Sequence, residues 1–310
     1  MQQKEMRSNL LLLLTAAIWG FAFVAQRIGS KYVGSFTFNG VRFALGGLSL
    51  VPLLIFSLRN SPAAVQQTGQ RPVSSFRAGI IAGSILFAGA SLQQIGLAHT
   101  AAGKAAFITG LYIILVPILG IFLKQHSHIS VWIGAVLATT GLYLLSVTQN
   151  FTITLSDLLE LVGAFFWATH ILVIDYYTKK VHALKLCIIQ FLTCSVLSML
   201  AAFSFETISL SSLRLALIPI LYGGLCSVGI AYTLQVFAQK HAKPSHAAII
   251  MSMESVFASL GGYIILQENL GGRGYLACIL MLAGMLISQL PTIFTSPKSN
   301  LSRASDEESL

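Results

Sequence analysis

The stretch AAIWGFAFVAQR (Ala16–Arg27) returns in altered form in the second half of the chain as GAFFWATHILVID (Gly163–Asp175). When the two stretches are aligned, Trp19 falls on Trp167. A repeat inside one sequence tells how a fold is built without alignment to any other protein. We therefore expect two related units within the 310 residues of this chain.

Further matches follow in the same order along the two halves. They pair Arg42-Phe43 with Gln190-Phe191, SLQQIGLAHT (Ser91–Thr100) with TLQVFAQKHA (Thr233–Ala242), GKAAFITGLY (Gly103–Tyr112) with SHAAIIMSME (Ser245–Glu254), and Gly141 with Gly284. Each match is weak alone, because apolar sequences resemble one another by chance. Their common order and nearly constant spacing indicate an internal duplication.

The composition is that of a membrane protein. Hydrophobic residues make up 55% of the chain and charged residues 9%, against roughly a quarter charged in a soluble domain. Apolar stretches of about 20 residues, long enough to cross a bilayer as a helix, recur along the chain. We count ten, at Leu10–Ile28, Phe36–Leu58, Ala78–Ala98, Ala102–Leu123, Ile129–Val147, Ser156–Tyr177, Ala183–Phe203, Leu213–Val236, Ala247–Leu266 and Gly274–Thr292.

Five spans in each half have a geometric consequence. Because five is odd, the second half begins on the opposite side of the membrane from the first. The sequence thus predicts an all-α integral membrane protein whose ten transmembrane helices form two inverted five-helix repeats. We expect the repeats at residues 9–148 and 156–292, followed by a disordered cytoplasmic tail at 293–310. Inverted repeats are typical of transporters with a central site that opens alternately to either face.

The net charge of +9 does not indicate nucleic acid, since the basic residues are scattered over loops rather than gathered in a groove. With the N-terminus in the cytoplasm, thirteen of the 19 Lys and Arg residues fall on inner segments and six on outer ones, as the positive-inside rule predicts. We expect both termini in the cytoplasm and the chain in a cell inner membrane. The four cysteines all fall within apolar spans and are expected to pack as small hydrophobes.

Catalytic motifs are missing from the sequence. It has no nucleophile elbow, no zinc-binding HExxH and no P-loop, so we expect no enzyme activity, no cofactor, no metal and no ATP hydrolysis. The expected partners are a small-molecule substrate and the lipid bilayer, with the chain acting as a monomer or homodimer and binding no nucleic acid.

The Trp-containing openings of the two halves and the stretch KPSHAAIIMSMESVFASLGGYIILQE (Lys243–Glu268) resemble the EamA-like family of the drug/metabolite transporter superfamily. In that resemblance Glu254 takes the acid position of an LEPVF-like motif and Glu268 the closing acid. Ser255 stands where proline is common in the family, so the sequence does not decide whether the helix kinks there. The resemblance implies transport of amino acids, nucleotide precursors, cofactors or toxic compounds, commonly outward and by proton coupling or exchange.

Glu254 interrupts an apolar stretch near its middle. It follows Ser245 by nine residues, which is roughly 14 Å along a helix and close to the bilayer midplane. An ionised carboxylate costs several kcal/mol there, so we expect it to face the bundle interior and to be paired or protonated. Glu254 is therefore the candidate for proton coupling. The alternative is a neutral structural carboxyl that braces the two halves.

The candidate substrate-binding residues share a polar or aromatic side chain within an apolar span. They are Trp19, Arg42, Gln93, Gln94, Tyr112, Trp167, His170, Tyr222, Tyr232 and Gln235. Arg42 either neutralises an anionic substrate group or snorkels to the interface. His170, on the face of Trp167, binds substrate, relays protons or is a satisfied core histidine. Gln93 and Gln235 are suited to hydrogen bonding across the pseudo-twofold axis.

Other residues of the spans are assigned to structure. Glu160 and Asp175 lie nearer the ends of the sixth span, where we expect them to be interfacial. Glycines of the third, fifth and tenth spans allow close helix approach. Pro117 and Pro219 interrupt the fourth and eighth spans, as kinks or as gates.

Together these features predict a secondary-active transporter that exports a small polar metabolite such as an amino acid by alternating access, driven by a proton gradient or by exchange. One alternative is an importer or exchanger of a nucleotide-like or cofactor-like metabolite. An alternative of another class is an intramembrane lipid-modifying enzyme.

Overall fold

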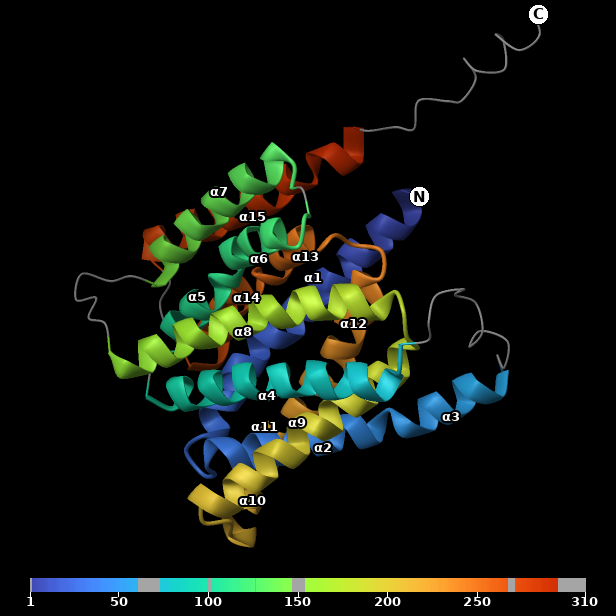
Figure 1. Ribbon diagram of the computed structural model, residues 1–310. Helices are drawn as coiled ribbons and strands as arrows, with labels where there is room; N and C mark the ends of the chain where they lie inside the picture. Colours follow the sequence, from blue (N-terminus) through green and yellow to red (C-terminus); the bar gives the residue numbers. More distant parts are fainter. Residues whose placement is uncertain are drawn as a thin grey trace, which may run out of the picture.

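A computed structural model describes residues 2–60, 73–99, 102–125, 127–146, 154–266 and 271–294, which form helices joined by turns and short loops. Within these residues nine helices are long and apolar enough to cross a membrane, and the shorter apolar helix Ile129–Leu144 adds a tenth (Figure 1). The expected ten-helix membrane fold is confirmed. Glu268, the expected closing acid, lies outside the described residues. Of the tail expected at 293–310, residues 295–310 also lie outside them, whereas 293 and 294 belong to the last helix.

The ten spans correspond to the following helices. The first half contains α1 (Gln2–Gly29), α2 with α3 (Ser35–Ser49, Val51–Asn60), α4 (Ser75–His99), α5 with α6 (Ala102–Gly110, Tyr112–Phe122) and α7 (Ile129–Ser146). The second half contains α8 (Leu155–Thr178), α9 (Ala183–Phe205), α11, η2 and α12 (Leu217–Leu221, Tyr222–Tyr232, Thr233–Gln239), α13 with α14 (Pro244–Met251, Glu254–Leu266) and α15 (Gly271–Phe294). A short helix, α10 (Leu210–Leu215), lies in the loop before the eighth span.

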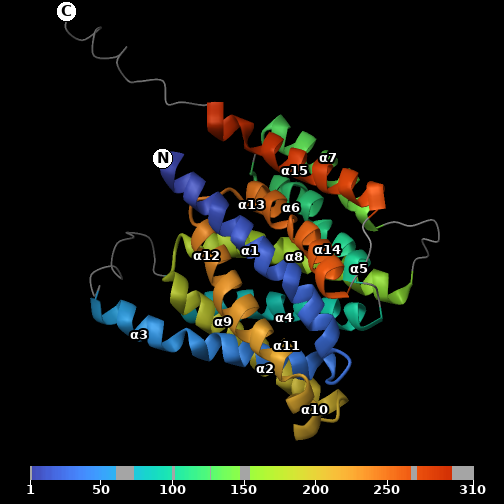
Figure 2. The same cartoon turned by 180° about the vertical axis from the view of Figure 1, so that it is seen from behind.

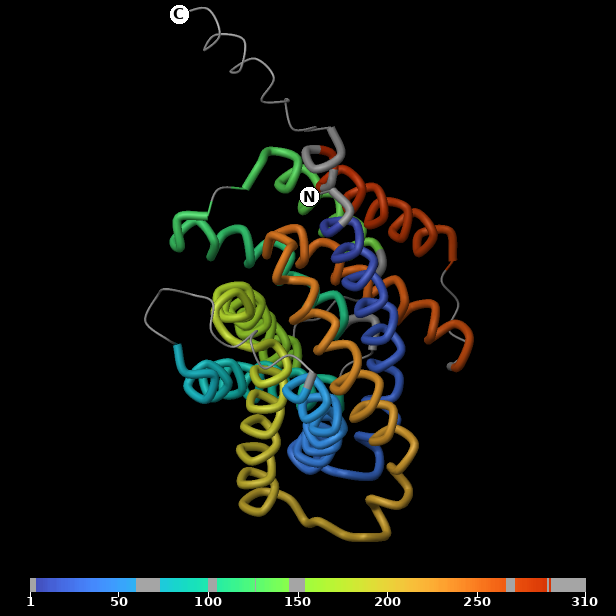
Figure 3. The backbone as a smooth tube through the Cα atoms, turned by 90° about the vertical axis from the view of Figure 1, so that its right-hand side faces the viewer, coloured from blue at the N-terminus to red at the C-terminus, as the bar shows by residue number. Residues whose placement is uncertain are grey.

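Most contacts between helices of the two halves have a counterpart. α4 packs on α8 as the eighth span packs on α1, and α4 packs on α9 as η2 packs on α2. α5 and α6 contact α8 as their counterparts α13 and α14 contact α1 (Figure 2). The pairs α2–α9 and α7–α15 are their own counterparts, and Figure 3 shows them at opposite ends of the bundle. The pattern is that of two repeats related by a twofold axis.

Two contacts locate this axis, because a residue touches its own repeat equivalent only near it. Phe43 and Phe191 are equivalent in the repeat alignment, and their ring centroids lie 6.2 Å apart. Tyr112 and Glu254 are also equivalent, and the phenol donates a hydrogen bond of 3.0 Å to Glu254 Oε1. The axis therefore passes through the α2–α9 pair and between the midpoints of the fourth and ninth spans.

Spans four and nine are both broken at their midpoints. α5 ends at Gly110 and α6 begins at Tyr112, while α13 ends at Met251 and α14 begins at Glu254. The local hydrogen bonds also correspond. They are Leu111 N to Ile108 O and Ile114 N to Leu111 O in the first half, and Met253 N to Ile250 O and Val256 N to Met253 O in the second. Both spans thus form the same short turn before the helix resumes.

The interruptions do not lie at the prolines. Pro117 is inside α6, which continues past it, and the break of the fourth span precedes it at Leu111. Pro219 lies in α11, and the eighth span then widens into the eleven-residue π-helix η2. The expectation that Pro117 interrupts its span was wrong, because α6 runs from Tyr112 to Phe122 through the proline.

Glycine allows the closest helix contacts. A Cβ atom on Gly134 would lie 2.6 Å from the carbonyl oxygen of Gly284, and a Cβ on Gly284 would lie 2.6 Å from that of Gly134. A Cβ on Gly141 would lie 2.7 Å from the carbonyl oxygen of Ala277. The backbones of α7 and α15 therefore meet directly, as small residues permit between membrane helices.

The two ends of the α2–α9 pair differ. Glu206, directly after α9, accepts hydrogen bonds at 2.8 Å from the backbone N–H groups of Phe36 and Thr37 and at 2.7 Å from the Thr37 hydroxyl. This carboxylate caps the N-terminus of α2, where the helix dipole favours negative charge. The repeat offset that pairs Phe43 with Phe191 makes Leu58 the equivalent of Glu206 in the first half. A leucine side chain accepts no hydrogen bond, so the first half cannot form the same cap.

Candidate functional site

A cavity lies at the centre of the bundle, with about 450 Å³ of space outside protein atoms, part of it open to solvent. Its lining combines aromatic rings, three glutamines, one arginine and one glutamate. The lining residues are Trp19, Phe23, Gln26, Arg42, Gln93, Thr109, Tyr112, Trp167, Ile171, Ser227, Tyr232, Gln235, Met251 and Glu254. They come from both halves and include five repeat-related pairs, which are Trp19 with Trp167, Phe23 with Ile171, Gln93 with Gln235, Thr109 with Met251, and Tyr112 with Glu254.

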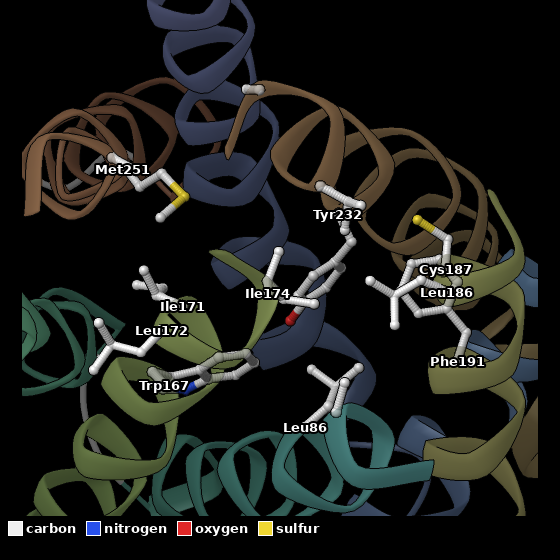
Figure 4. Packing of buried hydrophobic residues seen from close by; sticks show 14 of the residues in the cluster. Leu86, Trp167, Ile171, Leu172, Ile174, Leu186, Cys187, Phe191, Tyr232 and Met251 are labelled. Carbon is white, nitrogen blue, oxygen red and sulfur yellow. The ribbon is translucent and has the colours of Figure 1, made fainter. Parts of the chain in front are cut away.

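Tyr232 is the centre of the aromatic wall. Its ring centroid lies 4.6 Å from that of Trp19 and 6.1 Å from that of Trp167, with the Trp167 ring stacked on it. Figure 4 shows Trp167, Ile171 and Met251 on one side of this ring, and Phe191 on the other. The Trp19 indole N–H donates to the carbonyl oxygen of Ser227 at 3.3 Å, which fixes its ring. The wall therefore offers flat apolar surface to a bound molecule.

Arg42 brings a buried positive charge to the cavity. Its side chain is 2% exposed, and its Nε donates to Asn39 Oδ1 at 3.0 Å. The guanidinium carbon lies 4.9 Å from the ring centroid of Phe43 and 5.5 Å from that of Phe38, a cation–π arrangement. Among the described residues no carboxylate forms an ion pair with it. Arg42 does not snorkel, and an anionic group in the cavity would supply the missing partner.

Glu254 supplies the opposite charge type. It begins α14, is 4% exposed, and accepts the Tyr112 hydrogen bond on Oε1. A carboxyl group in this position either carries a proton or attracts a cationic group of a ligand. The cavity thus holds one fixed cation and one carboxyl group that can change its charge.

A second carboxyl group lies behind the cavity wall. Gln93 Nε2 donates to Thr109 Oγ1 at 3.3 Å, and Thr109 Oγ1 donates to Glu160 Oε2 at 3.0 Å. Glu160 is 0% exposed, so the expectation that it lies at the interface was wrong. Asp175 is also buried, at 5%, and pairs with Lys179 Nζ at 2.6 Å. Position along a span did not predict burial, because helices of the other half cover α8 at both ends.

Comparison with known proteins decides the family. The model of the EamA-like transporter family matches residues 6–147 and again residues 154–289. The chain belongs to the EamA-like transporter family. The match falls once on each half, as the repeat in the sequence indicates.

Relatives of this EamA-like chain carry transporter names. A protein of Archaeoglobus fulgidus called an uncharacterized transporter is 30% identical over 294 residues, covering 93% of this chain and 87% of its own. The uncharacterized transporter YoaV of Bacillus subtilis is 20% identical over 87% of this chain and 92% of its own. A solved crystal structure superimposes with a TM-score of 0.74 over 92% of this chain and 97% of that one, at 17% identity, which is a likeness of fold.

Seven of the ten candidate substrate-binding residues of this EamA-like transporter line the cavity. They are Trp19, Arg42, Gln93, Tyr112, Trp167, Tyr232 and Gln235, and Glu254 lies with them. The other three residues lie outside the lining. Gln94 Nε2 donates to the carbonyl oxygen of Gln26, His170 Nε2 is 3.0 Å from Gln190 Oε1, and the Tyr222 hydroxyl donates to the carbonyl oxygen of Ile18. Their side chains hold helices of the EamA-like fold together.

Six lining residues were not among the candidates, and helical spacing could have found five of them. Phe23 and Gln26 follow Trp19 by four and seven residues, Ile171 follows Trp167 by four, and Thr109 and Met251 precede Tyr112 and Glu254 by three. Ser227 precedes Tyr232 by five residues, the hydrogen-bond step of a π-helix. An α-helical pattern could not place it on the cavity face.

Proposed function

We propose that this membrane transporter is a secondary-active exporter of a small polar metabolite, with an amino acid as the leading substrate class, working by alternating access. The observation that carries the proposal is the cavity on the pseudo-twofold axis, which offers Arg42 and Glu254 to one ligand. A zwitterion presents an anionic and a cationic group together, which matches this lining. The aromatic wall around Tyr232 suits an apolar portion of the same molecule.

The energy source in this proposal is a proton gradient or substrate exchange. Glu254 is a carboxyl group at the cavity with Tyr112 as a neutral hydrogen-bond partner, so it is able to take up and release a proton as its surroundings change. The spacing of Lys and Arg along the chain supports a cell inner membrane with both termini in the cytoplasm.

The rival substrates are nucleotide-like or cofactor-like metabolites. Such ligands carry several negative charges and need several cations around them. Arg42 is the one Lys or Arg among the described lining residues, which favours a ligand with a single anionic group. The other rival class is a lipid-modifying enzyme. The transporter names of the relatives favour a protein that moves its ligand unchanged.

The test is a comparison of metabolites in medium and cells with and without overexpression of the chain. We expect one zwitterionic metabolite to accumulate in the medium. Arg42→Gln should abolish the accumulation, whereas Arg214→Gln should not, because Arg214 is exposed and lies in α10 away from the cavity. Depletion of a metabolite from the medium would indicate import, and a chemically altered lipid would indicate an enzyme.

A further inference from the structure

A line of hydrogen bonds leads from the cavity to a carboxyl group that substrate binding does not need. Gln93 and Thr109 both line the cavity, and Thr109 donates to Glu160, which does not line it. Thr109 therefore lines the cavity, and its hydroxyl joins the cavity residue Gln93 to the carboxyl group of Glu160.

The protein makes room for this carboxyl group. A Cβ atom on Gly96 of α4 would lie 2.7 Å from Glu160 Oε1, so a larger residue there would displace the carboxyl group from its present position. Glu160 Oε1 is buried and has no hydrogen-bond partner among the described residues. An ionised carboxylate needs donors on both oxygens, and a single hydroxyl donor on Oε2 leaves it short of one. The site therefore suits a group that binds a proton.

Among the side chains that the structure describes, the charged neighbour of Glu160 is on its own helix. Asp157, one turn earlier on α8, is buried and accepts hydrogen bonds from Thr154 N at 2.6 Å and Thr154 Oγ1 at 2.9 Å. The neighbouring helices α4 and α5 present Gly96 and Thr109, which do not ionise, and His99 at the end of α4 is exposed. Among the described residues no cation pairs with Glu160.

We propose that Glu160 is a second proton-binding site of the transporter, which exchanges its proton with the cavity through the Thr109 hydroxyl. In the uptake step a hydronium ion in the cavity gives a proton to Thr109 Oγ1 while the Thr109 hydroxyl proton passes to Glu160 Oε2. The products are water, an unchanged threonine and a neutral carboxyl group, and release is the reverse. Its role in coupling rests on the proposed function, but proton binding itself does not.

Infrared absorption of protonated carboxyl groups tests the site with the proton as the probe. The full chain in lipid nanodiscs is titrated from alkaline to acidic pH. We expect Glu160→Gln to remove one titrating band and Glu254→Gln to remove another. Asp175→Asn is the matched control, since Asp175 is a buried carboxylate of the same helix that is paired with Lys179, and it should leave both bands in place.

A pair of variants at residue 109 tests the route. Thr109→Val keeps the shape but removes the hydroxyl, so the Glu160 band should shift in frequency and its hydrogen–deuterium exchange should slow. Thr109→Ser keeps the hydroxyl and should leave the frequency and the exchange rate unchanged. A titration of Glu160→Gln identical to that of the wild type, or a Thr109→Val spectrum and exchange rate identical to the wild type, would overturn the proposal. Neither readout involves a metabolite, so failure to find an exported substrate leaves this result intact.

Discussion

Spans four and nine have the same backbone and different chemistry. Each breaks into two half-helices at equivalent residues, with equivalent short turns around Leu111 and Met253. The first residue of the second half-helix is Tyr112 in one span and Glu254 in the other, and these two residues bind each other. The two repeats thus share the break in the helix but differ in the side chain that follows it.

The difference follows from the position on the axis. Identical residues there would face each other, and two glutamates in close contact cannot both ionise at low cost. A hydrogen bond needs a donor and an acceptor, which tyrosine and glutamate provide. A repeat with glutamate at both positions would therefore be unfavourable at this one point, and the asymmetry leaves one carboxyl group at the contact.

The largest effect is expected from Glu254→Gln, which makes the two spans alike in having no acid. An amide cannot release a proton, so proton-driven transport in vesicles should fall to the level of vesicles without protein, while substrate exchange remains in part. Transport of the metabolite found by the export screen, measured with and without a pH gradient, checks this. An unchanged pH dependence would return Glu254 to a purely structural role.

A smaller effect is expected where α1 supports the second break. A Cβ atom on Gly20 would lie 2.7 Å from the carbonyl oxygen of Glu254, so Gly20→Ala should destabilise the protein by about 1–3 kcal/mol. The repeat equivalent is Ala168, where Ala168→Gly should cost about 1 kcal/mol through helix propensity. Thermal unfolding in detergent compares them. A greater loss for Ala168→Gly would contradict the assignment of the tighter contact to α1.

Removing the contact on the axis tests the link between the spans. Tyr112→Phe deletes one hydrogen bond and should cost about 1 kcal/mol of unfolding free energy. The same change in a Glu254→Leu background should cost nothing, since the acceptor is gone. A double-mutant cycle of the four proteins measures the coupling. Equal costs in both backgrounds would mean that the two side chains do not interact.

The smallest effect is expected from Pro117→Ala. Span nine makes the same break with Ser259 at the equivalent position, so the proline is not what breaks span four. We expect wild-type transport rates and thermal stability. A large loss of transport in this variant would show that the two breaks have different causes.

The sequence was sufficient for the architecture because hydropathy and the internal repeat are long-range patterns that survive local irregularity. The order of matches from Trp19 onward predicted the two halves, and the structure places five matched pairs around one cavity. The half-helix breaks were harder to foresee. They lie at Leu111 and at Ser252–Met253, whereas Pro117 and Pro219 lie inside helices.

Two site errors have separate physical causes. Tyr222 was expected in the cavity as an aromatic side chain with a polar group, but its hydroxyl donates to the carbonyl oxygen of Ile18, and the π-helix that begins at Tyr222 changes which residues share a face. Glu160 was assigned to the interface from its distance along the span, but α4 and α5 cover that end of α8, and Gly96 leaves space for its carboxyl group. Neither the change of helix type nor the cover supplied by other helices is written in the local sequence.

The hydrogen bond between Tyr112 and Glu254 has a further consequence. If each half adopts the shape of the other, the protein arrives at its opposite-facing form, and every contact moves to the place of its partner. The twofold axis maps the contact between Tyr112 and Glu254 onto itself, so this hydrogen bond is kept in both forms. The Glu206 cap on α2 lies off the axis, and its repeat equivalent is Leu58, which accepts no hydrogen bond. The same exchange of shapes would therefore break the hydrogen bonds of this cap without forming equivalent ones.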